Sequence, residues 1–238
     1  ASISLTLIDL DPKYTKGALA LAREALLLEL RKKGLDKKNK ELKLTSFPLK
    51  IGVLSAPGSR ALSDFLHQLE AGNYPGKILV LPVSMQGEKT VTQVASGIKQ
   101  LESLNCDLIV MTRGGGSAAD LRWFDLPEIA YALAKSKTPI IAAIGHHDDY
   151  CVAEEIAFER RKTPTAAADF ILERILLVKE RIQASCARLS ENLQKLTKLE
   201  TQKQNKLLTS LRLACQENLS FKAKKILSRV SPVESEIR

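Results

Sequence analysis

The chain has 238 residues, with 36 Lys and Arg against 27 Asp and Glu, which gives a formal net charge of +9. Such an excess favours a polyanionic partner through long-range attraction, nucleic acid ahead of an anionic membrane surface. No apolar stretch is long enough to span a bilayer, no signal-peptide pattern opens the chain, and the four cysteines show no CxxC pairing. These features exclude membrane-spanning and disulfide-rich classes and predict a cytoplasmic protein with reduced thiols.

The first part of the chain alternates between predicted helices and strands. Residues 14–33 are rich in Ala and Leu and end at Gly34, which can cap a helix in the left-handed conformation. Continuous apolar runs then predict strands, with segments of helical period between them, at 51–55, 77–83, 107–112 and 139–145. Strands of this kind are typical of a parallel sheet buried on both faces, so we predict an α/β fold, a Rossmann-like sheet flanked by helices.

The last part of the chain predicts one long helix from about Thr165. Apolar residues recur at intervals of three and four between residues 175 and 199, which places them in one stripe along a helix. Residues 171–238 hold 14 Lys and Arg against 7 Glu, so this segment carries most of the excess charge. We therefore predict an α/β domain at 1–170 and a long helical, coiled-coil segment at 171–238. Its stripe must be covered by a partner helix, by self-association or by the α/β domain of the same chain.

A first candidate site follows the strand at 107–112. Arg113 comes directly after this strand and is followed by Gly114, Gly115, Gly116 and Ser117. Open parallel sheets bind ligands beyond the carboxyl ends of their strands, where glycines let backbone N–H groups close around an anion and a guanidinium adds charge. The pattern predicts a phosphate cradle, while a tight turn with Arg113 in solvent is the structural alternative.

A second candidate site follows the strand at 139–145, where the chain reads His146, His147, Asp148 and Asp149. An imidazole that titrates near neutral pH, together with carboxylates that orient it, suits general acid–base catalysis. The same four residues could instead bind a divalent ion such as Mg²⁺, although adjacent residues rarely all point at one ion. One of the aspartates could also cap a helix.

Asp64 lies in the predicted helix that follows the first strand. Taken alone, a carboxylate at this position fits a solvated helix residue. It becomes a candidate because its strand is expected to lie beside the strands that precede the other two sites.

Several ordered blocks within residues 8–170 resemble the large subunit of exodeoxyribonuclease VII, a family of bacterial nucleases that degrade single-stranded DNA. These blocks read IDLDPKYTKGAL, PLKIGVLSAPGSRALSDFL, VLPVSMQGE, TRGGGSAADLRWFD, IGHHDDYCVAEEIA and KTPTAAADF. The basic helix that follows resembles the start of the family's coiled-coil region. The resemblance therefore implies a catalytic nuclease subunit whose helix carries small subunits and whose substrate is single-stranded DNA.

The resemblance also assigns roles to residues. The family's functional positions match Asp64, Arg113, His146 and Asp149, and its RGGGS loop matches residues 113–117. It implies that Arg113 and the glycine amides hold the scissile phosphate and that His146 acts as general base or acid. Asp149 or Asp64 would orient the imidazole or the water, and no metal ligand is assigned.

The chain departs from the family pattern at three positions, where the family usually has other residues: Ala119 in place of an acidic residue, His147 in place of Glu, and Glu154 in place of Asp. The family also has an OB-fold domain before the catalytic domain, and residues 1–15 are too few to form it. We therefore expect a fragment that keeps the catalytic domain and part of the helix. The rival hypotheses are a metal-dependent phosphoesterase and a catalytically silent DNA-binding or scaffolding module.

Overall fold

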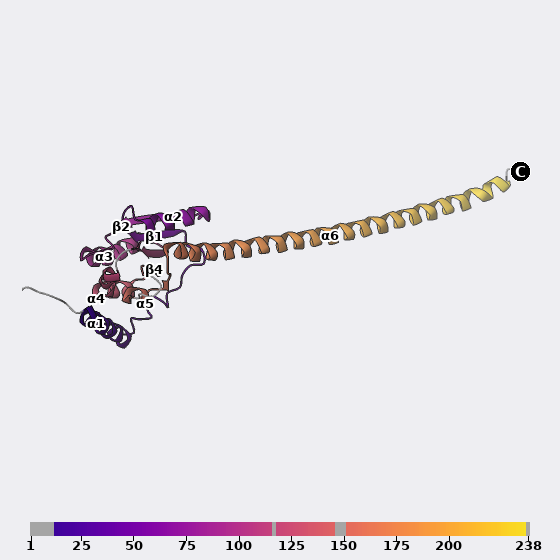
Figure 1. Ribbon diagram of the computed structural model, residues 1–238. Helices are drawn as coiled ribbons and strands as arrows, with labels where there is room; N and C mark the ends of the chain where they lie inside the picture. Colours follow the sequence, from indigo (N-terminus) through magenta and orange to yellow (C-terminus); the bar gives the residue numbers. More distant parts are fainter. Residues whose placement is uncertain (1–11, 116–117, 146–150, 237–238) are drawn as a thin grey trace, which may run out of the picture. The chain divides into compact units, whose positions relative to one another are not determined.

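A computed structural model describes residues 12–115, 118–145 and 151–236 of the chain (Figure 1). The chain divides into two compact units, residues 1–178 and residues 179–238. Among the helices in the described ranges, none is long and apolar enough to cross a membrane.

The first unit is built on a five-stranded sheet in which every neighbouring pair is parallel. The strands lie in the order β2-β1-β3-β4-β5. Their bounds are Lys50–Ser55 for β1, Lys77–Pro82 for β2, Leu108–Thr112 for β3, Ile140–Ala143 for β4 and Glu159–Arg160 for β5. The four predicted strands are confirmed, whereas β5 was not predicted because two residues show no periodicity.

Helices connect and cover these strands. They are α1 at Pro12–Lys32, α2 at Arg60–Ala71, α3 at Lys89–Ser103, a 3-10 helix η1 at Ala118–Asp125, α4 at Pro127–Lys135, α5 at Val152–Ile156 and α6 at Pro164–Glu236. The first helix ends as predicted, since Gly34 has φ +62°. Both the helix at the start of the chain and the long helix at its end are therefore confirmed.

Alternate residues of the strands pack on opposite faces of the sheet. On one face, Ile109 and Met111 of β3 belong to a core that includes buried residues of α1, α3, α4 and α5. On the other face, Val110 packs in a core with Phe65 of α2 and Ile171 from the start of α6. The sheet is thus buried on both sides, which explains the continuous apolar runs and confirms the Rossmann-like arrangement.

Asn39, in the connection between α1 and β1, ties three segments of the first unit together. Its side chain is fully buried, and its Nδ2 donates to the carbonyl oxygens of Leu133 (3.4 Å) and Thr138 (3.1 Å). Its Oδ1 accepts hydrogen bonds from the backbone nitrogens of Ile140 (3.0 Å) and Phe158 (2.9 Å). One side chain therefore pairs four backbone groups at α4, β4 and the residue before β5.

We expect Asn39→Asp to destabilise the first unit by at least about 2 kcal/mol, because a carboxylate would face two carbonyl oxygens and leave buried groups unpaired. Urea unfolding followed by circular dichroism measures the change as a lower midpoint. The control is Asn73→Asp, which makes the same chemical change at an exposed residue of the same unit. Equal midpoints for the two variants would contradict this role for Asn39.

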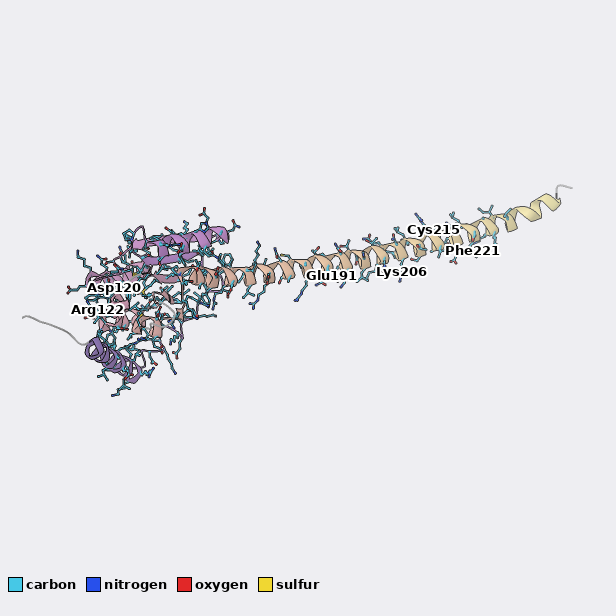
Figure 2. The ribbon with its side chains drawn as sticks, in the orientation of Figure 1. Asp120, Arg122, Glu191, Lys206, Cys215 and Phe221 are labelled. Atoms are coloured by element: carbon cyan, nitrogen blue, oxygen red, sulfur yellow. The ribbon has the colours of Figure 1, made fainter. Side chains whose placement is uncertain are left out.

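The second unit consists of helical residues from α6, and all its described side chains, at positions 179–227, are exposed within this chain. Figure 2 shows Glu191, Lys206, Cys215 and Phe221 extending outward from this helix. The stripe residues that follow the first unit are among the exposed ones: Ile182, Leu189, Leu193, Leu196 and Leu199. Earlier in the stripe, Ile175 packs against the core of the first unit. The predicted need for a partner thus applies to the later part of the stripe.

Candidate active site

The candidate site lies at the carboxyl ends of β1 and β3, which are neighbours in the sheet although β2 lies between them in sequence. The chain leaves these two strands toward opposite edges of the sheet, so this is the switch point at which open α/β sheets form a ligand crevice. The hydroxyl of Ser55 on β1 donates to the carbonyl oxygen of Thr112 on β3 at 3.2 Å. This hydrogen bond joins the two strand ends at the crevice.

The loop after β1 brings the start of α2 to the same place. Gly58 has φ +66°, a conformation that other residues rarely adopt, and it lets the chain turn directly after β1. Ser59 then caps α2, because its Oγ accepts the backbone N–H of Leu62 at 3.2 Å. The Ser59 hydroxyl also lies 3.1 Å from that of Ser55, so the helix cap is hydrogen-bonded to the end of β1.

Arg113 is the first residue after β3, and its side chain is only 5% exposed. Its backbone N–H donates to the carbonyl oxygen of Ala143 at the end of β4, at 3.1 Å. Its Nη2 lies 3.5 Å from Oδ2 of Asp120, a residue of η1 that Figure 2 labels. The alternative in which Arg113 is simply solvated is therefore wrong, since the guanidinium is buried and held by a carboxylate.

Gly114 and Gly115 follow Arg113, and nothing in the described part of the chain requires glycine at these two positions. Neither has a positive φ. A Cβ on Gly114 would lie 3.7 Å from Ala61, an ordinary contact, and a Cβ on Gly115 would meet none of the described residues within 4 Å. Backbone conformation and packing therefore do not explain these glycines, and close approach of a ligand to the backbone is an explanation that does.

A pocket of about 790 Å³ opens at this point. It is formed by the ends of β1, β2 and β3 together with the start of α2 and one residue of α3, Gln93. Its lining residues are Ala56, Pro57, Ser59, Arg60, Pro82, Val83, Ser84, Met85, Gln86, Gln93, Arg113, Gly114 and Gly115. Among these described lining residues the charged ones are Arg60 and Arg113, and none is acidic. Two cations and the N-terminus of α2 favour an anionic ligand.

Asp64 lies on α2, one turn after Arg60, and is not among the residues that line the pocket. Its side chain is 47% exposed, and its Oδ2 is 3.8 Å from Nε of Arg60. The structure therefore places Asp64 beside an arginine of the pocket and brings it into solvent contact. Its role as a functional carboxylate stays a prediction.

The other predicted site residues are Gly116, Ser117, His146 and Asp149, and they lie outside the described residues, as do His147 and Asp148 of the proposed metal cluster. One described stretch of the chain ends at Gly115, and another ends at Gly145. Gly145 follows β4 at the carboxyl edge of the sheet. Within the described ranges, no group of three or more His, Cys, Asp and Glu is arranged to hold a metal.

Two carboxylates near this edge, the buried Glu154 and the partly buried Asp125, were not predicted from the sequence to have a role. Glu154 of α5 accepts hydrogen bonds from the backbone nitrogens of Ile144 and Gly145. Asp125, the last residue of η1, accepts one from the backbone nitrogen of Val152. Burial raises the pKa of Asp125, and the Val152 N–H opposes that shift. The sequence singled out Glu154 only as a departure from the family pattern, and its place among apolar residues in CVAEEIA does not distinguish it from Glu155.

The model of the family "Exonuclease VII, large subunit" matches residues 35–237 of the chain. The chain belongs to this family. Among the relatives of this exonuclease VII family is the exodeoxyribonuclease 7 large subunit of Koribacter versatilis, 33% identical over 178 residues. That match covers 74% of this chain and 39% of the relative. The corresponding protein of Oceanobacillus iheyensis is 38% identical over 154 residues, 64% of this chain and 34% of the relative.

The chain spans about two fifths of the length of the exonuclease VII relatives it matches. The matched part includes the β3 and β4 ends described above, since the family model extends over 35–237. Family membership therefore rests on the first unit and α6 together. It does not rest on any single motif.

Proposed function

We propose that this chain is the catalytic part of an exonuclease VII large subunit that hydrolyses phosphodiester bonds of single-stranded DNA to oligonucleotides in the cytoplasm. The observation that carries the proposal is the pair Gly114 and Gly115, which line a pocket with Arg113 and which none of the described residues requires to be glycine. A phosphodiester has the charge and the small oxygens that such a backbone surface accommodates.

The chemistry can be divided among the residues of this edge of the sheet. The buried guanidinium of Arg113, held by Asp120, would bind the scissile phosphate and stabilise the charge that develops on its oxygens. His146 would take a proton from the attacking water while the water oxygen bonds to phosphorus. The bond from phosphorus to the leaving oxygen then breaks, and that oxygen accepts a proton from solvent water. Asp149 or Asp64 would orient the imidazole or the water.

The basic helix supports a nucleic-acid substrate and a protein partner. Its exposed leucines would bind small subunits of the enzyme, and its lysines would attract the DNA backbone. Self-association of the same helix is the alternative assembly.

A nuclease assay on single-stranded DNA, with and without EDTA, tests the proposal in the full-length large subunit with its small subunits. We expect digestion to oligonucleotides that persists in EDTA, and much slower digestion of a double-stranded control. Activity that EDTA abolishes and Mg²⁺ restores would support the metal-dependent alternative. Binding of DNA without digestion in either condition would support the silent scaffold.

A further inference from the structure

The pocket at the ends of β1, β2 and β3 is larger than a phosphate group requires. Its volume of about 790 Å³ lies within the range of about 300–1,000 Å³ that is usual for pockets enclosing a whole small-molecule ligand. Its two arginines, Arg60 and Arg113, come from the start of α2 and the end of β3. Among the described lining residues, those at the end of β2 carry no charge. A phosphate alone would leave that side of the pocket unfilled.

The side at the end of β2, the β2 wall, combines apolar side chains with amides. Because β1 lies between β2 and β3, the strand ends that carry this wall and Arg113 are two strand spacings, roughly 10 Å, apart. Apolar side chains gain nothing from contact with a phosphate, whereas they can cover the face of a base or a deoxyribose. A ligand that fills the pocket therefore extends from a charged end to an apolar one. The residues of the β2 wall are Pro82, Val83, Ser84, Met85, Gln86 and Gln93.

Hydrogen bonds fix the β2 wall relative to the charged end of the pocket. The backbone N–H of Val83 donates to the carbonyl oxygen of Ser55 at 3.0 Å, and the hydroxyl of Ser55 donates to Thr112. The Oγ of Ser84 donates to the carbonyl oxygen of Gln86 at 2.6 Å, which closes the turn after β2. The two sides of the pocket are thus joined through Ser55, and the protein itself holds the wall in place.

Gln93 of α3 supplies a directed hydrogen-bond donor to this wall. Its Oε1 accepts the backbone N–H of Ser84 at 2.6 Å, although the residue is exposed. Its Nε2 makes no hydrogen bond within the described part of the chain, so both of its N–H groups are available to a ligand. All four bases carry oxygens or ring nitrogens that accept such a bond, so the contact does not require a particular base.

We propose that the pocket binds one nucleotide unit of the strand, with a phosphate at Arg113, Gly114 and Gly115 and the attached nucleoside against the β2 wall. The Nε2 of Gln93 donates to the base. The inference rests on the proposed nuclease function and deepens it, because it adds a nucleoside site beside the phosphate. Phosphate contacts alone hold any polyanion, whereas a nucleoside site favours nucleic acid over other polyanions.

The test is calorimetric titration of the full-length large subunit with its small subunits. One probe is thymidine 3′,5′-bisphosphate, which has a phosphate on each side of the nucleoside and so serves either strand direction. The other is the matching sugar bisphosphate without a base. Since both carry the same phosphates, the ratio of their dissociation constants isolates the contribution of the base. We expect the thymidine probe to bind at least about tenfold more tightly, from one hydrogen bond and the apolar contact.

Two variants of Gln93 test its hydrogen bond. Gln93→Glu keeps an acceptor for the Ser84 N–H but has no donor, and Gln93→Ala has neither. Both should lower the ratio of dissociation constants by roughly 3- to 10-fold, the usual effect of one hydrogen bond. Repulsion between the new carboxylate and the phosphates acts on both probes and cancels in the ratio. The matched control is Gln100→Ala, at an exposed residue of α3 that does not line the pocket, and it should leave the ratio unchanged.

Arg113→Ala tests whether the phosphate and the base occupy the same pocket, because it should weaken both probes by similar factors. A ratio near one in the unmodified enzyme, or equal ratios for Gln93→Glu and Gln100→Ala, would overturn the nucleoside site. Unchanged binding of both probes to Arg113→Ala would also overturn it, since the probes would then bind elsewhere. None of these titrations requires hydrolysis, so a failure to digest single-stranded DNA refutes the proposed function separately.

Discussion

Arg113→Ala is expected to lower kcat for the hydrolysis of single-stranded DNA by about 10²–10³-fold, the usual loss when a charge-stabilising donor is removed from a transition state. The guanidinium is buried at the end of β3, is held by Asp120 and lines the pocket, so water can replace it only poorly. Arg113→Lys should be nearly as inactive, because an ammonium cannot reproduce the planar fork. Steady-state kinetics on a labelled single strand measures both.

The control is Arg122→Ala, which removes an exposed arginine of η1, the helix that carries Asp120; Figure 2 labels both residues. The Arg122 guanidinium lies over the ring of Trp123, 4.7 Å from the ring centroid. It should leave kcat almost unchanged. A loss of kcat equal to that of Arg113→Ala would show that activity depends on η1 as a whole and not on the Arg113 guanidinium alone.

His146→Ala should resemble Arg113→Ala, with a loss of kcat of about 10²–10⁴-fold. His147→Ala should be milder, and the reverse order would favour the metal-dependent alternative.

The strands and the position of Arg113 could be predicted from the sequence because they depend on local patterns. A continuous apolar run identifies a buried parallel strand, and the residue that follows it must lie at the carboxyl edge of the sheet. Arg113 and Gly145 are placed at that edge, as expected. The same rule could not show that the Arg113 guanidinium is buried, since Asp120, which holds it, lies in a 3-10 helix without a clear sequence period.

Long-range hydrogen bonds were beyond prediction because no local pattern records them. Asn39 bonds to Phe158, which is 119 residues away, and Asp125 bonds to Val152, which is 27 residues away. The carboxylate of Glu154 and that of its neighbour Glu155 look alike in the sequence, yet one is buried against Arg160 and the other is not. This difference in burial depends on how β4, β5 and α5 pack together, and the order of the elements in the sequence does not determine that packing.

Substitution of the exposed apolar residues of α6 is expected to have a large effect on assembly with the small subunits. We expect the triple change Leu189→Ser, Leu193→Ser and Leu196→Ser to abolish binding of the small subunits. Burial of each leucine contributes roughly 1.5 kcal/mol or more, so the association constant should fall by about 10³ or more. These three side chains are more than half exposed in the chain, so serine there leaves no cavity in it and the helix itself should persist.

The matched control places serine at Ala187, Gln194 and Asn205, which a period of 3.6 residues puts on the opposite side of the same helical segment. Light scattering of the chain alone and with purified small subunits measures both variants. If the small subunits bind the leucine variant as tightly as the control, the stripe is not their site. If the unmodified chain forms dimers that only the leucine variant loses, the partner of this helix is a second copy of the same chain.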